Sequence, residues 1–409
     1  MNAQKISTIA VPAALLVMAL VGGSILLLRL FFLSGLVIAV SYLWTRWSLR
    51  NLSVLTTKPP EHLQVGDTFQ QEITISNSDK LPRFWLRVQN DTDLPGYHDT
   101  AIINIARQSS YSWQTNFGCR KRGRYHLGPV TVIATDPLGI FTSRCALGEA
   151  QEITVCPATI DLSLAKFASF SDFGYGSGYQ SINLASPNAS GVREFVSSDS
   201  SHHIHWRSTA RMGKLMVKKF DTDHSYSTSK IAWILLDMNE KAHFRQGEET
   251  SDEYAITIAA SVAKKYLQDG MRVGILASDE RRCLITPQRG EEQLWGILEA
   301  LALIRTDPKL KLSELVSHNL DGFHDNPLVI IVATSTSENL VEIIHQLRNR
   351  VDSVVVILLD VADFGGRLSS TGVSRTLTWS GAQVYTITKR AELSKALDNK
   401  IRQLPQLLV

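Results

Sequence analysis

The stretch Ile231-Ala232-Trp233-Ile234-Leu235-Leu236-Asp237 decides the fold of the C-terminal half of the chain. Six consecutive apolar residues before a carboxylate are typical of a strand buried on both faces, because a strand with one wet face alternates apolar and polar residues. Similar apolar runs follow, and helical patterns at 253–267, 291–304, 339–348 and 391–404 alternate with them; the runs are 272–277, 283–285, 328–333, 353–359 and 383–387. This alternation predicts a doubly wound α/β domain with a parallel sheet.

The residues that follow the first strand form the candidate ligand site, because doubly wound sheets bind ligands at the carboxyl ends of their strands. A von Willebrand factor A-type domain has D-x-S-x-S here, and its Asp and Ser oxygens hold Mg²⁺ or Mn²⁺. This chain resembles that pattern in part, with Asp237 as the first ligand and Asn239 as a source of an amide oxygen. Lys241 places an ammonium where the third oxygen belongs, and Thr334-Ser335 end the fourth strand without an acidic residue.

We therefore expect a degenerate metal site and no cofactor, with Asp237 capping a helix or binding a backbone turn. The alternative is a ligand-binding domain that depends on Mg²⁺ or Mn²⁺ and uses Asp237, Asn239 and one of Thr334 and Ser335.

A dense group of charges surrounds Trp206, ahead of this domain. Arginine, lysine and carboxylate side chains intermingle there, at Arg193, Glu194, Asp199, Arg207, Arg211 and Lys218. Such a group suits a buried ion-pair network or a recognition surface, and we favour the network because it is the commoner cause. His202, His203 and His205 raise the possibility of zinc, but no cysteine or fourth ligand is near, so we expect surface or hydrogen-bonded histidines. A hydrolase that uses one of these histidines with Asp199 is the remaining alternative.

Residues 60–160 contain short runs of partly alternating apolar residues between Gly, Pro, Asn and Asp. This pattern predicts an antiparallel β-sandwich with a structural role. Residues 161–191 are expected to be a flexible linker. Its run Gly174–Tyr179 lacks the G-K-[ST] of a phosphate-binding loop.

The N-terminal residues 1–50 predict a transmembrane helical hairpin. From Ile6 to Trp44 the only charge is Arg29, and Gly22-Gly23-Ser24 favours a turn, so we place the spans at about 6–21 and 24–44. Basic residues flank the pair at its two ends: Lys5, Arg46, Arg50 and Lys58. The positive-inside rule then predicts a two-span protein of the inner (plasma) membrane with its soluble domains in the cytoplasm.

Composition excludes other classes for this chain of 409 residues. The 42 basic and 39 acidic side chains give a formal net charge of +3, which provides no electrostatic case for a nucleic-acid partner. Four scattered cysteines fit a reducing compartment rather than a disulfide scaffold.

The order of these motifs resembles the domain of unknown function 58 family. The signature comprises Val192-Arg193-Glu194-Phe195, Ile204-His205-Trp206-Arg207 and Gly213–Lys218, after R-G-x-Y-x-L-G-P at 122–129 and D-P-x-G-x-F at 136–141. The sequence departs from the common pattern at Ser198, His202 and His205. The resemblance implies two N-terminal spans, a β-rich module and a von Willebrand factor A-like domain at 192–409. It also implies a partner, a MoxR-type AAA+ ATPase or a transglutaminase-like membrane protein.

These observations favour a membrane-anchored, non-catalytic scaffold whose cytoplasmic domain docks a protein partner. The sequence gives no prediction of the oligomeric state.

Overall fold

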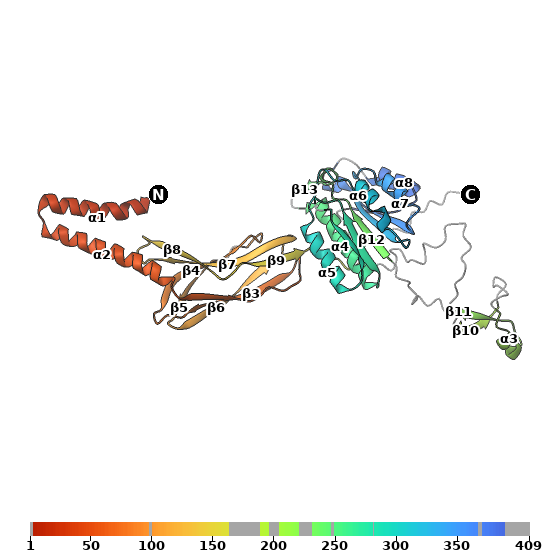
Figure 1. Cartoon of the computed structure of the whole chain (residues 1–409), viewed down its shortest axis with the longest axis horizontal. Helices are drawn as coiled ribbons and strands as arrows, with labels where there is room; N and C mark the ends of the chain where they lie inside the picture. The colour runs from red at the N-terminus through yellow and green to blue at the C-terminus, as the bar shows by residue number, and fades with distance from the viewer. Residues whose placement is uncertain are drawn as a thin grey trace. The chain divides into compact units, whose positions relative to one another are not determined.

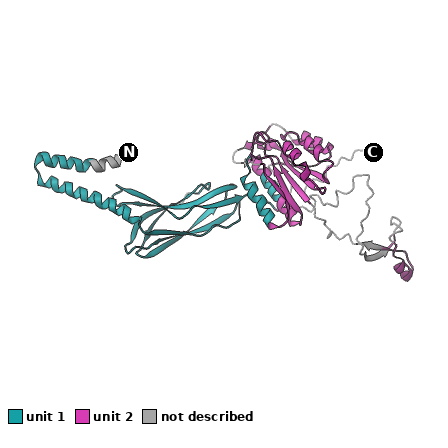
Figure 2. Cartoon of the chain, in the orientation of Figure 1, with its two compact units in different colours: residues 1–160, 256–261, 292–305 teal, residues 161–255, 262–291, 306–409 magenta. Residues whose placement is uncertain are grey.

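The computed structural model describes residues 3–97, 100–162, 189–195, 204–220, 231–246, 249–280, 282–366 and 370–388. Two compact units divide the chain, shown in different colours in Figure 2. Unit 1 comprises residues 1–160, 256–261 and 292–305, and unit 2 comprises 161–255, 262–291 and 306–409. Asp199, His202, His203, most of the predicted linker and the predicted helix 391–404 lie outside the described residues.

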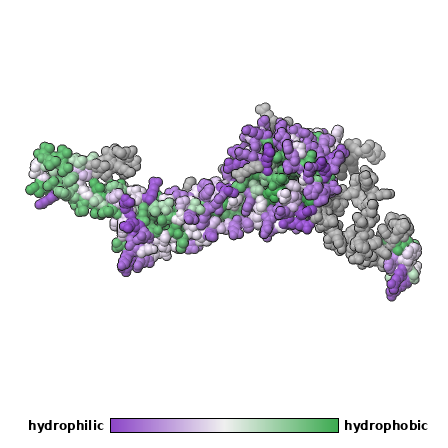
Figure 3. All heavy atoms as spheres, viewed as in Figure 1, coloured by the Kyte–Doolittle hydropathy of each residue, from purple (hydrophilic) through white to green (hydrophobic). Residues whose placement is uncertain are grey.

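Two helices begin the chain, α1 (Ala3–Gly22) and α2 (Ile25–Ser48) (Figure 1). The break between them falls where the paired glycines predict it, with Gly23 at φ +61°. By length and composition α2 can cross a membrane, whereas the apolar part of α1, residues 10–22, is shorter. Figure 3 shows the apolar surface of the described part of both helices. A membrane helix is therefore supported for α2, and the second span stays a prediction.

The end of α2 is fixed to the sheet that follows it by a buried arginine. Arg83 is 1% exposed, and its guanidinium lies 3.8 Å from the centroid of the Trp47 ring. Its Nη2 donates to Asp79 Oδ2 at 2.7 Å and to the carbonyl of Arg50 at 3.3 Å. Burial lowers the pKa of Arg83, and the Asp79 carboxylate opposes that shift. The charge is thus held by a carboxylate, a carbonyl and an aromatic face at the base of the helix.

Two sheets form the predicted sandwich. One has the order β1-β3-β6, and the other has the order β2-β9-β7-β4-β5 with β8 paired to β7. All pairings are antiparallel except that of β2 with β9. The strands are β1 (Leu52–Thr56), β2 (Leu63–Gln64), β3 (Thr68–Asn77), β4 (Arg83–Thr92), β5 (Thr100–Ile105), β6 (Ser109–Gly118), β7 (Gly123–Thr135), β8 (Thr142–Leu147) and β9 (Gln151–Cys156).

Alternate residues of the facing sheets meet in one core, where Ile73 and Ile75 of β3 pack with Val88 of β4 and Val132 of β7. Strand β1 begins at Leu52, ahead of the predicted boundary at 60, because Leu52 and Val54 pack against this core.

The R-G-x-Y motif of β7 binds the end of a helix within unit 1. Arg122 donates from Nε to the carbonyl of Leu301 at 3.1 Å and from Nη2 to the carbonyl of Ile304 at 2.9 Å. These carbonyls end α5 (Glu291–Leu303) and the turn after it, where a cation is favourable. Tyr125 holds the turn that carries Arg122, since its hydroxyl donates to the carbonyl of Lys121 at 3.1 Å.

Unit 2 contains the predicted α/β sheet, in the order β16-β15-β12-β17-β18-β19. Its strands are β12 (Ile231–Leu236), β15 (Arg272–Ala277), β16 (Leu284–Gln288), β17 (Leu328–Thr334), β18 (Ser353–Leu359) and β19 (Gln383–Ile387). Strand β16 is antiparallel at the edge, and the other five are parallel. In chain order this is 3-2-1-4-5-6, the order that doubly wound sheets share. The strands expected from the buried apolar runs are confirmed.

Helices α6 (Leu312–His318), α7 (Leu340–Leu347) and α8 (Ser370–Trp379) contribute Val316, Ile344 and Leu377 to a core on the sheet face of Trp233. Helix α4 (Ser251–Gln268) and helices α5 and α7 fall at predicted positions. Helices α6 and α8 were not predicted, because the seven residues of α6 make less than two turns and α8 has one buried apolar residue, Leu377, so neither shows a clear period. The shorter elements are β10 (Ala189–Glu194), α3 (Trp206–Met212), β11 (Met216–Phe220), η3 (Glu240–Ala242), β13 (Arg245–Gln246), β14 (Glu249–Thr250), η4 (Leu320–Gly322) and η5 (Val361–Phe364).

Replacing Arg83 by alanine should destabilise unit 1, because Asp79 loses its partner and Trp47 loses its contact. We expect the free energy of unfolding to fall by about 3 kcal/mol, measured by urea unfolding of the full chain in detergent. Arg87→Ala on the same strand is the matched control; its side chain is exposed, and its loss should change stability by under about 0.5 kcal/mol. Equal effects of the two variants would contradict the anchoring role.

Candidate functional site

The carboxyl edge of the α/β sheet brings polar residues from separate strands together. Asp237 follows β12, Ser278 follows β15, and Thr334 ends β17. Because these strands are parallel neighbours in the sheet, their ends lie at one edge. After β12 the chain adds β15 and β16 on one side, and then β17, β18 and β19 on the other side. The switch point between β12 and β17 is the place where ligands bind in doubly wound folds.

The Asp237 residue is buried, and the Oδ1 atom of its carboxylate is bound by groups of the chain itself. It is 4% exposed, and its Oδ1 accepts from the Asn239 N–H at 3.1 Å and from the Ser278 hydroxyl at 3.2 Å. The Ser278 oxygen accepts in turn from the Met238 N–H at 2.8 Å. The side chain therefore organises the turn that follows β12.

Asn239 serves the next turn. Its Oδ1 accepts from the Lys241 N–H at 3.0 Å, which caps η3, and its Nδ2 donates to the carbonyl of Leu310 at 3.3 Å. Lys241 itself is exposed and contributes its N–H to this turn, and the role predicted for its ammonium stays a prediction.

His243 completes the contacts around Asp237. Its Nε2 lies 2.8 Å from the Asp237 carbonyl, and its Nδ1 lies 3.1 Å from the Ser251 hydroxyl, which accepts from the Phe244 N–H at 2.9 Å. A carbonyl can only accept, so Nε2 carries the proton, and the Ser251 hydroxyl can donate to Nδ1. A neutral imidazole satisfies all of these groups.

The end of β17 is tied to the same loop. The hydroxyls of Thr334 and Thr336 each donate to the carbonyl of Ala242 at 2.8 Å. The Ser335 hydroxyl accepts from the Val361 N–H at 3.3 Å. Thr334 and Ser335, the candidate metal ligands on this strand, thus bind backbone groups.

As a cation site the edge has a sparse donor set. Asp237 is the carboxylate that follows β12, the Asn239 oxygen is committed to η3, and the two further carboxylates of the edge, Asp279 and Asp360, accept from groups of the chain. In the described part of the chain no three His, Cys, Asp or Glu side chains cluster closely enough to hold a metal ion. Mg²⁺ and Mn²⁺ prefer about six oxygens, so this donor set fits them poorly.

Several residues of this edge were missed by the sequence analysis: His243, Ser251, Ser278, Asp279 and Asp360. Asp279 accepts from the Cys283 N–H at 2.8 Å, and Asp360 Oδ2 accepts from the Ser370 hydroxyl at 2.7 Å. The signal was present, since Ser278-Asp279 and Asp360 directly follow buried strands as Asp237 does. His243 and Ser251 gave none, because only the folded loop brings them to Asp237.

The signature residues belong to a small hairpin in unit 2. Strands β10 and β11 pair antiparallel, with Arg193 opposite Val217 and Glu194 opposite Met216. Glu194 Oε1 and Lys214 Nζ form an ion pair at 2.9 Å, and both side chains are exposed. The backbones of Arg193 and Lys218 lie in the strands, and their side chains are outside the described part.

Helix α3 lies between the two strands in the sequence and contains exposed signature residues. His205 caps it, with Nδ1 accepting from the Ser208 N–H at 3.2 Å, and Gly213 ends it at φ +67°. Trp206 is 67% exposed, and Arg207 and Arg211 are exposed too. The described charged side chains of this hairpin, at Glu194, Arg207, Arg211 and Lys214, are therefore exposed, and the predicted network that includes Asp199 stays a prediction.

Cys119, Cys156 and Cys283 have the raised pKa of packed rather than catalytic thiols. Burial raises the pKa of Cys119, raises that of Cys156 to about 12 and raises that of Cys283 to about 11. A thiolate nucleophile requires the opposite shift.

Cys283 should therefore alkylate slowly in the native chain. A pKa of about 11 instead of 9.0 leaves about a hundredfold less thiolate at pH 8, so labelling by iodoacetamide should be slower by about that factor than after unfolding. The shifted pKa also affects stability. From pH 9 to 11 the thiol ionises in the unfolded chain but stays protonated in the folded one, so the free energy of unfolding falls over this window. Mass spectrometry of labelled peptides measures the rate, and equal rates in both states would contradict the burial.

Asp237→Ala should destabilise unit 2, because the Asn239 N–H and the Ser278 hydroxyl lose their acceptor. We expect a loss of about 2 kcal/mol, measured by thermal unfolding of the full chain in detergent. Glu240→Ala, an exposed carboxylate of the same loop, is the control and should have little effect. A rise in melting temperature with millimolar Mg²⁺ or Mn²⁺ that disappears in Asp237→Ala would contradict the purely structural role.

The fold and the site define an α/β domain whose ligand edge is filled by its own loops, preceded by a β-sandwich and an apolar helix. Residues 191–392 match the family described as "Protein of unknown function DUF58". The chain is 22% identical over 199 residues to "Uncharacterized protein YeaD" of Bacillus subtilis (strain 168), which covers 49% of this chain and 47% of that protein. The chain thus spans about half the length of this curated relative.

Solved structures resemble about a quarter of the chain. The CARDB domain of PF1109 from Pyrococcus furiosus is 13% identical, with 26% of this chain and 94% of that chain covered and a TM-score of 0.20. A chain of the human complex of zinc 2-glycoprotein with prolactin inducible protein is 9% identical, with 26% and 97% covered and a TM-score of 0.20. At these TM-scores the likeness indicates no function.

Proposed function

We propose that this chain is a membrane-anchored, non-catalytic scaffold that docks a protein partner through its C-terminal α/β domain. In this proposal α1 and α2 both span the inner membrane, and the sandwich and the α/β domain lie in the cytoplasm. The α/β domain is of the von Willebrand factor A-like type, with a cation site that has been lost.

One observation carries the proposal: the exposed signature on α3. Trp206 is 67% exposed beside Arg207 and Arg211, which stand four residues apart and so share one face of the helix. Tryptophan and arginine are the residue types most enriched at the energetic centres of protein interfaces. The filled carboxyl edge supports the same conclusion, since its polar groups already bind one another.

The partner's chemistry follows from the charge of this surface. Residues 204–220 include Arg207, Arg211 and Lys214 and no acidic residue, so an acidic protein surface complements them. The resemblance to the DUF58 family suggests a MoxR-type AAA+ ATPase as this partner, with a transglutaminase-like membrane protein as a further member of the assembly.

The anchor is supported by the length of α2 and by the basic residues around the helices. Arg46 and Arg50 follow the apolar part of α2, and Lys5 precedes that of α1. A hairpin with both ends in the cytoplasm places all of them on the side that the positive-inside rule favours.

Capture of the full-length chain in detergent should recover the MoxR-type ATPase encoded by the same organism. Reversing the charges with Arg207→Glu and Arg211→Glu should weaken recovery about tenfold or more, the effect of losing an interface centre. Arg375→Glu, at an exposed arginine of α8, is the matched control and should leave recovery unchanged. Quantitative mass spectrometry of the captured material gives the ratio.

Two results would contradict the proposal. One is recovery of no ATPase by the unmodified chain, and the other is equal loss with the α3 and α8 variants, which would indicate a general effect of charge.

A further inference from the structure

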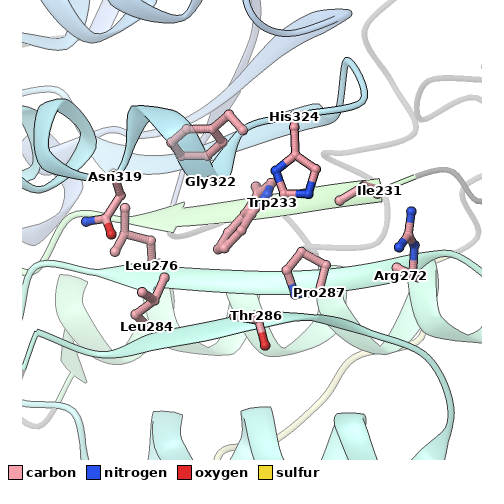
Figure 4. Close-up of a pocket in the computed structure, with 11 residues that line it drawn as sticks. Ile231, Trp233, Arg272, Leu276, Leu284, Thr286, Pro287, Asn319, Gly322 and His324 are labelled. Carbon is pink, nitrogen blue, oxygen red and sulfur yellow. The ribbon is translucent and has the colours of Figure 1, made fainter.

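Unit 2 contains a pocket that the carboxyl edge does not use (Figure 4). It has a volume of about 270 Å³ and lies on the sheet between β12, β15, the edge strand β16 and the segment after α6. It is lined mainly by apolar side chains, at Ile231, Trp233, Leu276, Leu284, Pro287 and Phe323. Since a cavity of about 150 Å³ can admit benzene, this one has room for a large aromatic side chain.

Trp233 gives the pocket an unmet hydrogen bond. Its side chain packs edge-on against Phe323, with ring centroids 5.3 Å apart, and the residue is 4% exposed. Its buried Nε1–H has no acceptor among the described residues. A buried indole N–H usually has a partner, so an occupant with an acceptor group would satisfy it.

The same unit contains large apolar side chains that are exposed to solvent. Among its described residues the large apolar side chains that remain exposed are Trp206, Met212, Leu215, Leu284 and Trp379. Leu284 lines the pocket, and three of the others belong to the signature hairpin. Figure 3 shows the hairpin's apolar and hydrophilic surfaces side by side.

Among the described side chains of the hairpin only two are buried, Met216 and Val217 of β11. Within α3, which is described in full, no residue is buried. A two-stranded ribbon with one short helix is marginally stable in water, so it gains stability by packing against another surface.

Chain connectivity limits where that surface can be. Ten residues, 221–230, join the end of β11 at Phe220 to the start of β12 at Ile231. Such a connection spans at most about 35 Å. Ile231 itself lines the pocket, so the hairpin is tethered to the pocket's edge.

Charge favours the same pairing. The hairpin is basic between 204 and 220, and the loop that forms one wall of the pocket contains Asp321 and Asp325, both exposed. Asp325 has a long ion pair with Arg272, at 3.9 Å, and Asp321 pairs with Arg350 at 3.1 Å. Both carboxylates retain oxygens that face solvent and can meet Arg207 and Arg211.

We propose that the signature hairpin docks on its own α/β domain, with the indole of Trp206 in the pocket beside Trp233. A carbonyl of the hairpin then accepts from Trp233 Nε1–H, and Met212 and Leu215 cover Leu284. The inference deepens the proposed function, because docking would hide Trp206 until a partner competes for it. It is tested without a partner, so the two proposals can fail separately.

Hydrogen exchange of the full-length chain in detergent tests the docking. Trp206→Ala should raise the exchange rate of amides in 284–288 and 319–324 by about tenfold or more. Trp379→Ala is the matched control, since Trp379 is also a helical tryptophan and is 92% exposed, and it should leave those rates unchanged.

A second variant changes the pocket instead of the hairpin. Thr286→Trp fills the pocket from β16 without altering the hairpin, and it should raise exchange and proteolysis within 204–220. The melting temperature of Thr286→Trp shows whether this variant folds. If it does not fold, Leu284→Ala replaces it, because that change only removes a lining side chain that the docked hairpin would contact.

Three results would overturn the inference. Pocket exchange that is unchanged by Trp206→Ala shows that the hairpin does not cover it. Protection that rises with protein concentration assigns the pocket to a second copy of the chain. Protection of 204–220 that appears only with vesicles of anionic lipid assigns the hairpin to the membrane surface.

Discussion

A buried carboxylate at the end of a central strand has to be neutralised or hydrogen-bonded, and the rest of unit 2 depends on how Asp237 meets that requirement. Here the donors come from the chain: the Asn239 N–H and the Ser278 hydroxyl bind the carboxylate, while His243 binds the carbonyl of the same residue. The loops after β12, β15 and β17 are thereby connected into one network. Groups of the chain itself therefore hold this edge together.

The arginines of unit 1 show the same principle at the other end of the chain. Arg83 joins Trp47 and Asp79 at the base of α2, and Arg122 binds the carbonyls that end α5. Each guanidinium satisfies several acceptors in fixed directions, which a lysine could not do. The R-G-x-Y motif, read from the sequence as a mark of resemblance, thus has a mechanical role: it holds a helix end to the sandwich.

Period and composition were sufficient to predict the helix break at Gly23, the buried strands and the long helices. They failed where a few residues had to be assigned without a period, as in α6 and α8, and where a contact depends on the folded loop, as between His243 and Asp237. Lys241 illustrates the limit well. Its spacing from Asp237 suggested a charge within the site, but residues 240–242 form a turn of η3, and the side chain is exposed. The number of residues between two side chains predicts the distance between them only when the conformation of the intervening turn is known.

The signature hairpin contains the sharpest conflict between the sequence and the local structure. Trp206, Met212 and Leu215 are exposed there, although burying each would contribute about 2 kcal/mol. Within the same unit an apolar pocket retains a buried indole N–H without an acceptor. The exposed apolar side chains and the indole N–H without an acceptor are each unfavourable alone. Docking of the hairpin in the pocket would remove both. The ten-residue connection between the hairpin and the pocket, 221–230, makes their pairing effectively intramolecular, so even a weak contact would be well populated until a competing surface is presented.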